Sequence, residues 1–170
     1  MMAGGWYGFN VIEDQRAGQQ AAEILSHWED EPRIPQGDEG AAPVIVVDGD
    51  AFCGQIVIDK LGIELPVYNQ WSNKRLKSAP CRYSGNVVTD DMIIAAHNYK
   101  SHFGPLSKLR RGDGVAFVDA YGTVHRYVVR DMTTLDGTAV SDMHAGGWDL
   151  TLFTCTKSGE QRVTVRCERA

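Results

Sequence analysis

The sequence lacks the features that define several common classes of protein. No stretch reaches the ~18–20 apolar residues that a membrane-spanning helix requires, and no long basic run is present. The formal net charge of −5 argues against a nucleic-acid partner, because phosphates demand a positive protein surface. The opening MMAGGWYGFN has neither the basic nor the apolar segment of a signal peptide. We therefore expect a globular chain.

Cysteine is also scarce. The chain has four cysteines, Cys53, Cys81, Cys155 and Cys167. No two of them form a CxxC pair, which argues against a structural zinc site, and the chain is no small Cys-dense scaffold. The even count leaves a disulfide between Cys53 and Cys81 open. Cys167 alternates with Val163 and Val165 in RVTVRC, so we predict that it is a buried small hydrophobic residue.

The features that are present indicate one β-rich domain after an N-terminal extension. The 170 residues suffice for one domain with a hydrophobic core. Residues 10–30 predict a helix whose apolar face packs on the domain; that face consists of Ala17, Ala21, Ile24, Leu25 and Trp28. Residues 29–43 are acidic and rich in proline and glycine, as in a linker. Residues 1–43 thus form the extension and residues 44–170 the domain.

From Val44 onward, short β-type runs alternate with turn residues. The runs are VIVVD, GQIVID, ELPVY, NVVT, MIIAAH, GVAFVDA, TVHRYVV, LTLFTC and RVTVRC. About eight strands in ~125 residues predict an all-β fold, either a closed or nearly closed barrel or a sandwich. One helical turn is expected at SHFGPLSKL, where Phe103, Leu106 and Leu109 share a face.

The segment TLFTCTKSGEQRVTV predicts a hairpin with a cysteine at the end of one strand and an arginine at the start of the next. In simple antiparallel register Cys155 and Arg162 oppose each other, with Cβ atoms roughly 4.5–5.5 Å apart. A cation there stabilises a thiolate and can hydrogen-bond an oxyanion. Arg166 lies ~13 Å further along the strand, so Arg162 is the better candidate. The alternative is a chance pairing of a cysteine with a surface arginine.

A nucleophilic cysteine usually needs a histidine as its acid and base. His97 ends the apolar run MIIAAHN and precedes a loop, which is where a scaffold displays catalytic groups. His102 follows as a second choice. His27 belongs to the predicted helix, His125 to an exposed strand position, and His144 to a glycine-rich loop, so we rank these three lower.

These residues carry a resemblance to a known family. TLFTC resembles the TLxTC signature of sortases, the cysteine transpeptidases of Gram-positive surfaces. GQIVIDKLGIELPV, MIIAAHNYKSHFGPLSKLRRGD and GEQRVTVRCER resemble its first strands, its histidine segment and its final strand, so that the resemblance covers residues 44–170. It implies a sortase-type β-barrel of about eight strands. The short hairpin and HFGPLSKL favour class D or a class B-like group.

The resemblance also implies roles for individual residues and for partners. Cys155 would be the nucleophile, His97 the acid and base, and Arg162 the anchor for oxyanion and substrate, while Thr154 would help to bind substrate. The substrate would be an LPXTG-like sorting signal of a surface protein, and the acceptor an amine of a cell-wall precursor or a pilin. The enzyme would act at the extracellular face of the membrane.

Acidic and aromatic residues bear on two further questions, whether the protein uses a metal and whether it is attached to a membrane. No metal or other cofactor is expected, because the acidic residues form no calcium-loop pattern; they are Asp90, Asp91, Asp113 and Asp119. Trp6, Tyr7 and Phe9 resemble the aromatic interface that follows a membrane helix. Either the sequence begins just after a membrane anchor, or this is an ordinary mobile terminus.

A substrate groove is expected beside the hairpin. Residues 131–150 form the longest loop-like segment there, and in sortases this region contributes to the groove. Ala139, Val140 and Met143 are candidates for an apolar pocket, although a plain surface loop would explain the segment as well. Two other functions stay open: a cysteine hydrolase with the same three residues, and a non-enzymatic β-barrel binding module in which Cys155 is merely buried.

Overall fold

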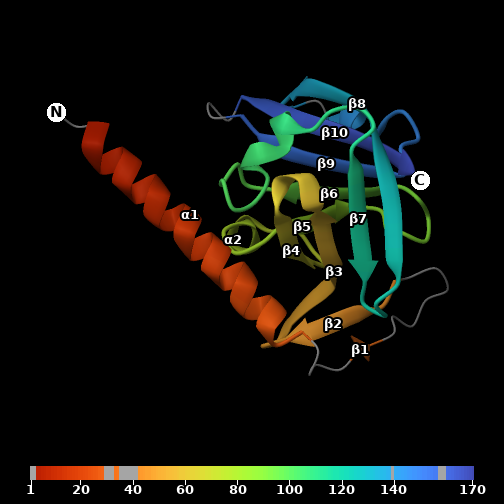
Figure 1. The fold of residues 1–170 in the computed structure, drawn as a ribbon, viewed down its shortest axis with the longest axis horizontal. Coiled ribbons are helices and arrows are strands. Elements are labelled where there is room, and N and C mark those ends of the chain that lie inside the picture. The colour runs from red at the N-terminus through yellow and green to blue at the C-terminus, as the bar shows by residue number, and fades with distance from the viewer. Residues whose placement is uncertain (1–2, 29–32, 35–41, 139, 157–159) are drawn as a thin grey trace.

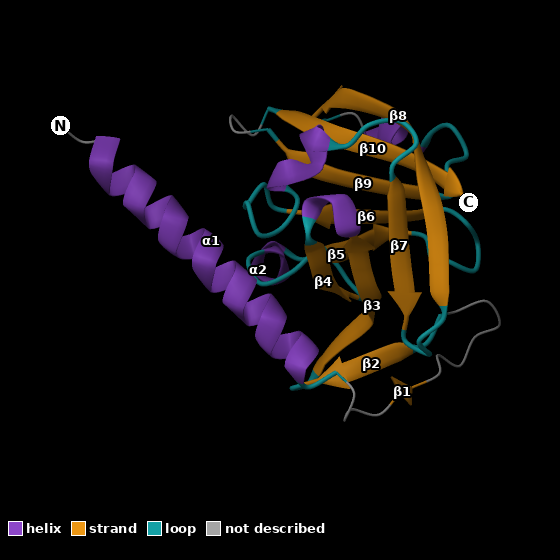
Figure 2. Cartoon of the chain, viewed as in Figure 1, coloured by secondary structure: helices purple, strands orange, loops and turns teal. Residues whose placement is uncertain are grey.

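A computed structural model describes residues 3–28, 33–34, 42–138, 140–156 and 160–170. A long helix, α1 (Ala3–Ser26), lies against a β-barrel (Figures 1 and 2). The strands are β1 (Arg33–Ile34), β2 (Val44–Val47), β3 (Asp50–Ile58), β4 (Ile63–Tyr68), β5 (Cys81–Ser84), β6 (Met92–Ala96), β7 (Gly114–Asp119), β8 (Val124–Asp136), β9 (Leu150–Cys155) and β10 (Gln161–Arg169). The short helices are η1 (Asp59–Leu61), α2 (Asn73–Leu76), η2 (Gly104–Lys108) and α3 (Val140–His144).

Eight of the described strands close into a barrel, as predicted. Their order is β3-β4-β5-β6-β9-β10-β8-β7, and the antiparallel pairing of β7 with β3 closes the ring. Two of its pairs are parallel, β4 with β5 and β6 with β9. The remaining strands, β1 and β2, extend the sheet from β3. Closure leaves the eight barrel strands with a partner on each side, so no barrel edge is exposed.

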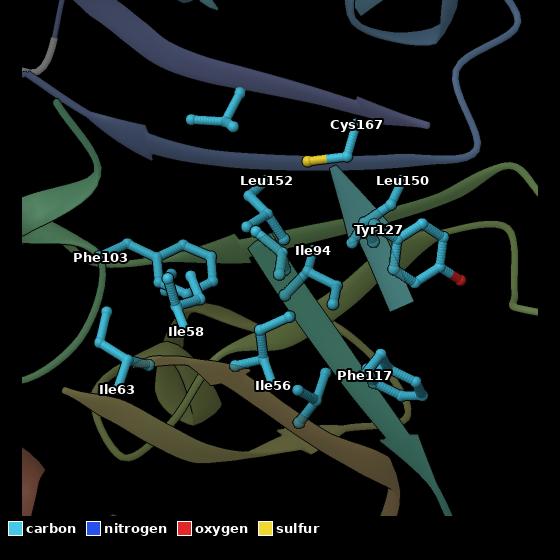
Figure 3. Packing of buried hydrophobic residues seen from close by; sticks show 14 of the residues in the cluster. Ile56, Ile58, Ile63, Ile94, Phe103, Phe117, Tyr127, Leu150, Leu152 and Cys167 are labelled. Atoms are coloured by element: carbon cyan, nitrogen blue, oxygen red, sulfur yellow. The ribbon is translucent and has the colours of Figure 1, made fainter. Parts of the chain in front are cut away.

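The barrel interior is filled by side chains from alternate positions of its strands (Figure 3). Ile56, Ile94, Leu152 and Cys167 are fully buried there, which confirms the prediction for Cys167. A large apolar side chain contributes ~1.5–3 kcal/mol when it is fully buried. The turn at η2 adds three more such residues, since Phe103, Leu106 and Leu109 are all fully buried, as their spacing predicts. This core fixes the strand ends from which the site is built.

Helix α1 packs through the face that the sequence predicts. Ala17 and Ala21 are buried, and so is Trp28 in the turn after the helix, whose ring meets Phe52 edge-on at a centroid distance of 5.7 Å. The helix begins at residue 3 rather than 10, in spite of the low helix propensity of its glycines. Its N-terminal half projects beyond the barrel (Figure 1). None of the helices in the described ranges has the length and apolarity that a membrane crossing requires.

One strand predicted from the sequence is not formed. NVVT is a turn rather than a strand, because the side-chain oxygen of Asn86 accepts hydrogen bonds from the backbone N–H groups of Val88 and Thr89. The strand at this point is β5, which starts at Cys81. The expected linker also contains a strand, β1, which pairs with β2, while most of the remaining linker lies outside the described residues.

Candidate active site

Three adjacent strands bring the predicted catalytic residues into one row. Cys155 is the last residue of β9, and it pairs with Arg162 of β10, so the predicted opposition is confirmed. Strand β6 runs parallel to β9, and their last pair is Ala96 with Thr154. His97 follows Ala96 directly, which places it level with Cys155 at the same end of the sheet. Neighbouring strands lie ~4.8 Å apart, so Cys155 sits between the histidine and the arginine.

The row borders a cavity of about 330 Å³. His97 and Arg162 both contribute to its wall, and so does Phe153, two residues before Cys155 along β9. Among the described residues, the lining consists of Trp71, Asn73, Leu76, Tyr83, Ala95, Ala96, His97, Asp136, Gly137, Met143, Phe153 and Arg162. The side chain of Cys155 lies outside the described part of the structure, and its place is given by the backbone register. Two of the three predicted catalytic side chains therefore face one cavity.

The environment of His97 favours its neutral form. Burial lowers the pKa of His97 below its ordinary value of 6.5. The carboxylate of Glu13 opposes this shift in pKa, whereas the ammonium group of Lys77 adds to it. The His97 ring also lies against Tyr99, with ring centroids 5.0 Å apart. Near neutral pH the imidazole is therefore mostly uncharged, as a base that must accept a thiol proton should be.

An aromatic wall forms one side of the cavity. Tyr83 meets Trp71 edge-on at 6.2 Å and Phe153 at 5.4 Å between ring centroids. Trp71 is 46% exposed, so an aromatic face stands open to solvent at this wall. With Leu76 and Met143 the wall offers an apolar surface. Sequence reasoning missed Trp71 and Tyr83, because one lies in a connection and the other in the unassigned strand β5, and neither carries a motif.

The segment between β8 and β9 supplies another part of the wall. Its first residues, 131–136, continue β8 rather than forming a loop, because they pair with β10. Met143 is buried and lines the cavity, so the structure places it where a groove residue was expected. Ala139 and the side chain of Val140 lie outside the described part, and their predicted contact with substrate stays a prediction.

Arg166 holds this wall in place. Its guanidinium group donates hydrogen bonds to the carbonyl oxygens of Asp142 at 2.6 Å and Met143 at 2.7 Å, and to Oγ1 of Thr151 at 3.0 Å. The side chain thereby connects the end of α3 to β9 and β10. Its hydrogen bonds give Arg166 a structural role, and the assignment of Arg162 to the cysteine stays a prediction.

We expect Arg166→Met to lower the free energy of unfolding by at least about 3 kcal/mol, since it removes three hydrogen bonds from a charged donor, which contribute about 1.5–3 kcal/mol each. Urea denaturation followed by tryptophan fluorescence measures this change. Arg130→Met is the matched control, because Arg130 makes an exposed ion pair with Glu168, and its loss should cost under about 1 kcal/mol. Equal losses in the two variants would contradict the structural role of Arg166.

The remaining predicted residues occupy distinct places. Thr154 is buried and does not line the cavity, so its part in substrate binding stays a prediction. His144 in α3 packs near the ring of Tyr83, and His27 follows the end of α1. His125 is half-buried rather than exposed, because its Nε2 lies 2.9 Å from the Asp119 carboxylate.

His102 is fully buried behind His97. Burial lowers the pKa of His102 to about 4, although the backbone of Ala17 and the carboxylate of Asp14 act in the opposite direction. Neither ring nitrogen makes a hydrogen bond of good geometry within the described residues, although the Ala17 backbone lies near enough to raise the pKa of His102. A neutral, enclosed imidazole of this kind is poorly suited to exchange protons with a substrate. The role of acid and base stays predicted for His97, which lines the cavity.

The buried His102 should make the fold sensitive to acid. Its folded pKa is lower than its unfolded value, so its contribution is complete above pH 6.5 and is lost as the pH falls toward 4. The shift corresponds to about 3 kcal/mol, at ~1.4 kcal/mol per pKa unit. Urea denaturation at several pH values should show a smaller decline over this range in His102→Phe than in the wild type. Equal declines would show that His102 is not responsible.

The other cysteines and the acidic residues show no second reactive centre. Cys53, Cys81 and Cys167 are free and buried, so Cys53 and Cys81 form no disulfide. Burial raises the pKa of each of these thiols to about 12. No group of three or more His, Cys, Asp or Glu residues in the described ranges could hold a metal ion. Asp90 and Asp113 instead form ion pairs with Arg169 and Lys60.

Comparisons with known proteins agree with this arrangement. A profile of the sortase domain matches residues 56–170. The structure resembles sortase C1 from Streptococcus agalactiae, with 27% identity and a TM-score of 0.65 over 74% of this chain and 70% of that one. It also resembles sortase A from Listeria monocytogenes, with 24% identity and a TM-score of 0.63 over 71% and 88% of the two chains.

Sortase C from Clostridium perfringens SM101 shares the fold along more of the sequence, with 20% identity and a TM-score of 0.61 over 93% of this chain and 89% of that one. No curated protein matches the sequence significantly. The domain profile nevertheless covers well over half of the chain, and its range contains Cys155, His97 and Arg162. The chain belongs to the sortase family.

Proposed function

We propose that the protein is a cysteine transpeptidase that cleaves an LPXTG-like sorting signal and transfers the acyl part to an amine. The observation that carries this proposal is the row of His97, Cys155 and Arg162 beside a cavity with an aromatic wall. Membership of the sortase family supports the same chemistry. The acceptor would be an amine of a cell-wall precursor or of a pilin.

The row suits acyl transfer in two steps. The sulfur of Cys155 attacks the carbonyl carbon of the scissile peptide bond, and the Arg162 guanidinium stabilises the oxyanion that forms. His97 then donates a proton to the leaving nitrogen, so that the C–N bond breaks and a thioester remains. In the second step His97 takes a proton from the incoming amine, which attacks the thioester and releases the thiol.

The protonation states set how much of the enzyme is active. A free thiol with a pKa near 8.5 is only ~3% thiolate at pH 7. The cation at position 162 increases this fraction, whereas burial lowers the pKa of His97 and reduces the imidazolium fraction. We propose that a minor thiolate–imidazolium pair is the reactive form.

The finer assignments complete the proposal. The hairpin of β9 and β10 is short and the HFGPLSKL segment forms η2, which support class D or a class B-like group; the structures matched above are named sortase C and sortase A. The enzyme would act on the outer face of the membrane.

Intact mass spectrometry with a library of LPXTG-like peptides tests the proposed function. We expect a thioacyl adduct on the wild type and none on Cys155→Ala. Addition of oligoglycine or a lysine peptide should then give a ligated product in place of the hydrolysed one. Hydrolysis alone with every amine would indicate a cysteine peptidase.

A thiol-labelling experiment separates the enzyme from a binding module. A methanethiosulfonate reagent should modify one thiol rapidly in the native protein, since the other three cysteines are buried. Absence of both the adduct and native labelling would favour a β-barrel that binds its ligand without reaction.

A further inference from the structure

We propose that helix α1 is part of the catalytic apparatus, because Asp14 positions the loop that carries His97. This loop, here called the histidine loop, comprises residues 97–103 between β6 and η2. The proposal rests on the proposed function, in which His97 is the acid and base. It assigns a positioning residue outside the range that the sortase profile matches, which begins at residue 56.

Asp14 holds the histidine loop through its carboxylate. One oxygen accepts the backbone N–H of Lys100 at 2.6 Å, and the other accepts the backbone N–H of Ser101 at 3.1 Å. The Ser101 hydroxyl also lies 2.7 Å from the second oxygen and 3.1 Å from the Asp14 carbonyl oxygen. A carboxylate that accepts several such bonds at once fixes both the position and the orientation of the backbone.

Small residues on α1 allow this close approach. Ala17 and Ala21 are 1% exposed, and a methyl group at Gly18 would lie only 3.1 Å from Cβ of Ser101. A larger side chain at these positions would push the helix away from the loop and lengthen the bonds to Asp14. The contact is thus built from both sides, by a carboxylate that binds the loop and by residues that leave room for it.

The histidine loop transmits this restraint to His97. The N–H of Phe103 donates to the carbonyl oxygen of His97 at 3.2 Å, and the N–H groups of His102 and Gly104 donate to the carbonyl oxygen of Tyr99 at 3.0 and 2.8 Å. Phe103 is fully buried in the barrel core, so the far end of the loop is also fixed. The near end carries His97, and Asp14 holds the turn between the two ends.

Asp14 is the acceptor for the two backbone N–H groups at residues 100 and 101. Lys100 is exposed, and the backbone N–H groups of residues 100 and 101 turn toward α1 rather than into a sheet. Without Asp14 they would be left to water, and the loop would gain freedom. A displacement of about 1 Å in a catalytic group can cost ~10²-fold in rate, so the restraint should be visible in catalysis.

Steady-state kinetics of Asp14 variants test the proposal. We expect Asp14→Ala to lower kcat by about 10- to 100-fold with KM within about twofold of the wild type. The kcat of Asp14→Asn should lie between those of the wild type and Asp14→Ala, because the amide oxygen still accepts a hydrogen bond from Ser101. Glu23→Gln is the matched control, since it removes an exposed carboxylate from the same helix, and it should leave kcat unchanged.

Two further measurements separate positioning from stability. In Asp14→Ala the NMR signal of the His97 imidazole should shift. If kcat is measured well below the melting temperature of the variant, unfolding cannot account for a lower kcat. Ser101→Ala removes the hydroxyl that bonds to Asp14 and leaves the two backbone N–H bonds in place. The double variant Asp14→Ala/Ser101→Ala should lose less activity than the product of the two single-variant losses, because both changes break the same contact.

The outcomes distinguish the possible errors. Wild-type kcat and an unshifted His97 signal in Asp14→Ala, with only a lower melting temperature, would overturn the proposal and leave α1 as a stabilising element. If Asp14→Ala does not fold, Asp14→Asn and Ser101→Ala carry the test. If the wild type forms no thioester with any peptide, the proposed function fails, while the His97 signal and the rate of Cys155 alkylation by iodoacetamide still decide whether Asp14 positions the loop.

Discussion

Replacing His97 with alanine should slow formation of the thioacyl enzyme by about 10³-fold, which is within the range of rate losses that follow removal of a general acid and base. The imidazole lies level with Cys155 across β6 and β9, and it lines the cavity that we propose for the substrate. Without it the thiol keeps its proton and the leaving amine departs as an unfavourable anion. Quenched-flow mass spectrometry under single-turnover conditions measures the rate directly.

The control for this prediction is His27→Ala. His27 is exposed beyond the end of α1, so its loss should leave the rate of acylation unchanged. A His97→Ala enzyme that acylates within tenfold of the wild type would show that another group carries the proton. His102 would then be the first alternative to test.

The dependence of kcat/KM on pH should also report the ionisation of His97. Because burial lowers the pKa of His97, the acid limb of kcat/KM should have its midpoint below pH 6.5. Glu13 raises the pKa of His97 and Lys77 lowers it, so Glu13→Gln should move this limb to lower pH and Lys77→Gln to higher pH. Shifts in the same direction for both variants would contradict the assignment of the limb to His97.

The pairing of Cys155 with Arg162 could be predicted from the sequence because side chains alternate between the two faces of a strand. The hairpin between β9 and β10 fixes its own register, so the pairing of Cys155 with Arg162 follows from spacing alone, although β10 begins one residue earlier than expected. His97 was likewise found from the end of an apolar run. These inferences need only neighbouring residues, and the structure confirms the register.

The long-range part could not be predicted in this way. Nothing local specifies that β6 pairs in parallel with β9, yet this pairing brings His97 level with Cys155. Trp71 and Tyr83 reach the cavity from segments whose sequence carries no strong period. The contact between Asp14 and Ser101 joins a helix to a loop far along the chain. Tertiary packing decides all three.

Arg162→Ala should lower the rate of acylation by about 10²- to 10³-fold, as the loss of an oxyanion donor does in other acyl-transfer enzymes. Arg162 pairs with Cys155 in the sheet, and a methyl group at Gly137, the residue after β8, would lie 3.4 Å from a guanidinium nitrogen of Arg162. Arg162→Lys should recover part of the rate, because it keeps the charge but loses the planar donor pair. Arg126→Ala, on an exposed position of β8, is the control and should be unaffected.

The same variants show which of two roles Arg162 has. If it mainly stabilises the thiolate, Arg162→Ala should slow alkylation of Cys155 by iodoacetamide as much as it slows acylation, since alkylation needs the thiolate but forms no oxyanion. If it mainly binds the oxyanion, alkylation should change little while acylation falls. The opposed register allows both roles, so the ratio of the two losses measures the share of each. Unchanged rates of both reactions in Arg162→Ala would remove Arg162 from the catalytic row.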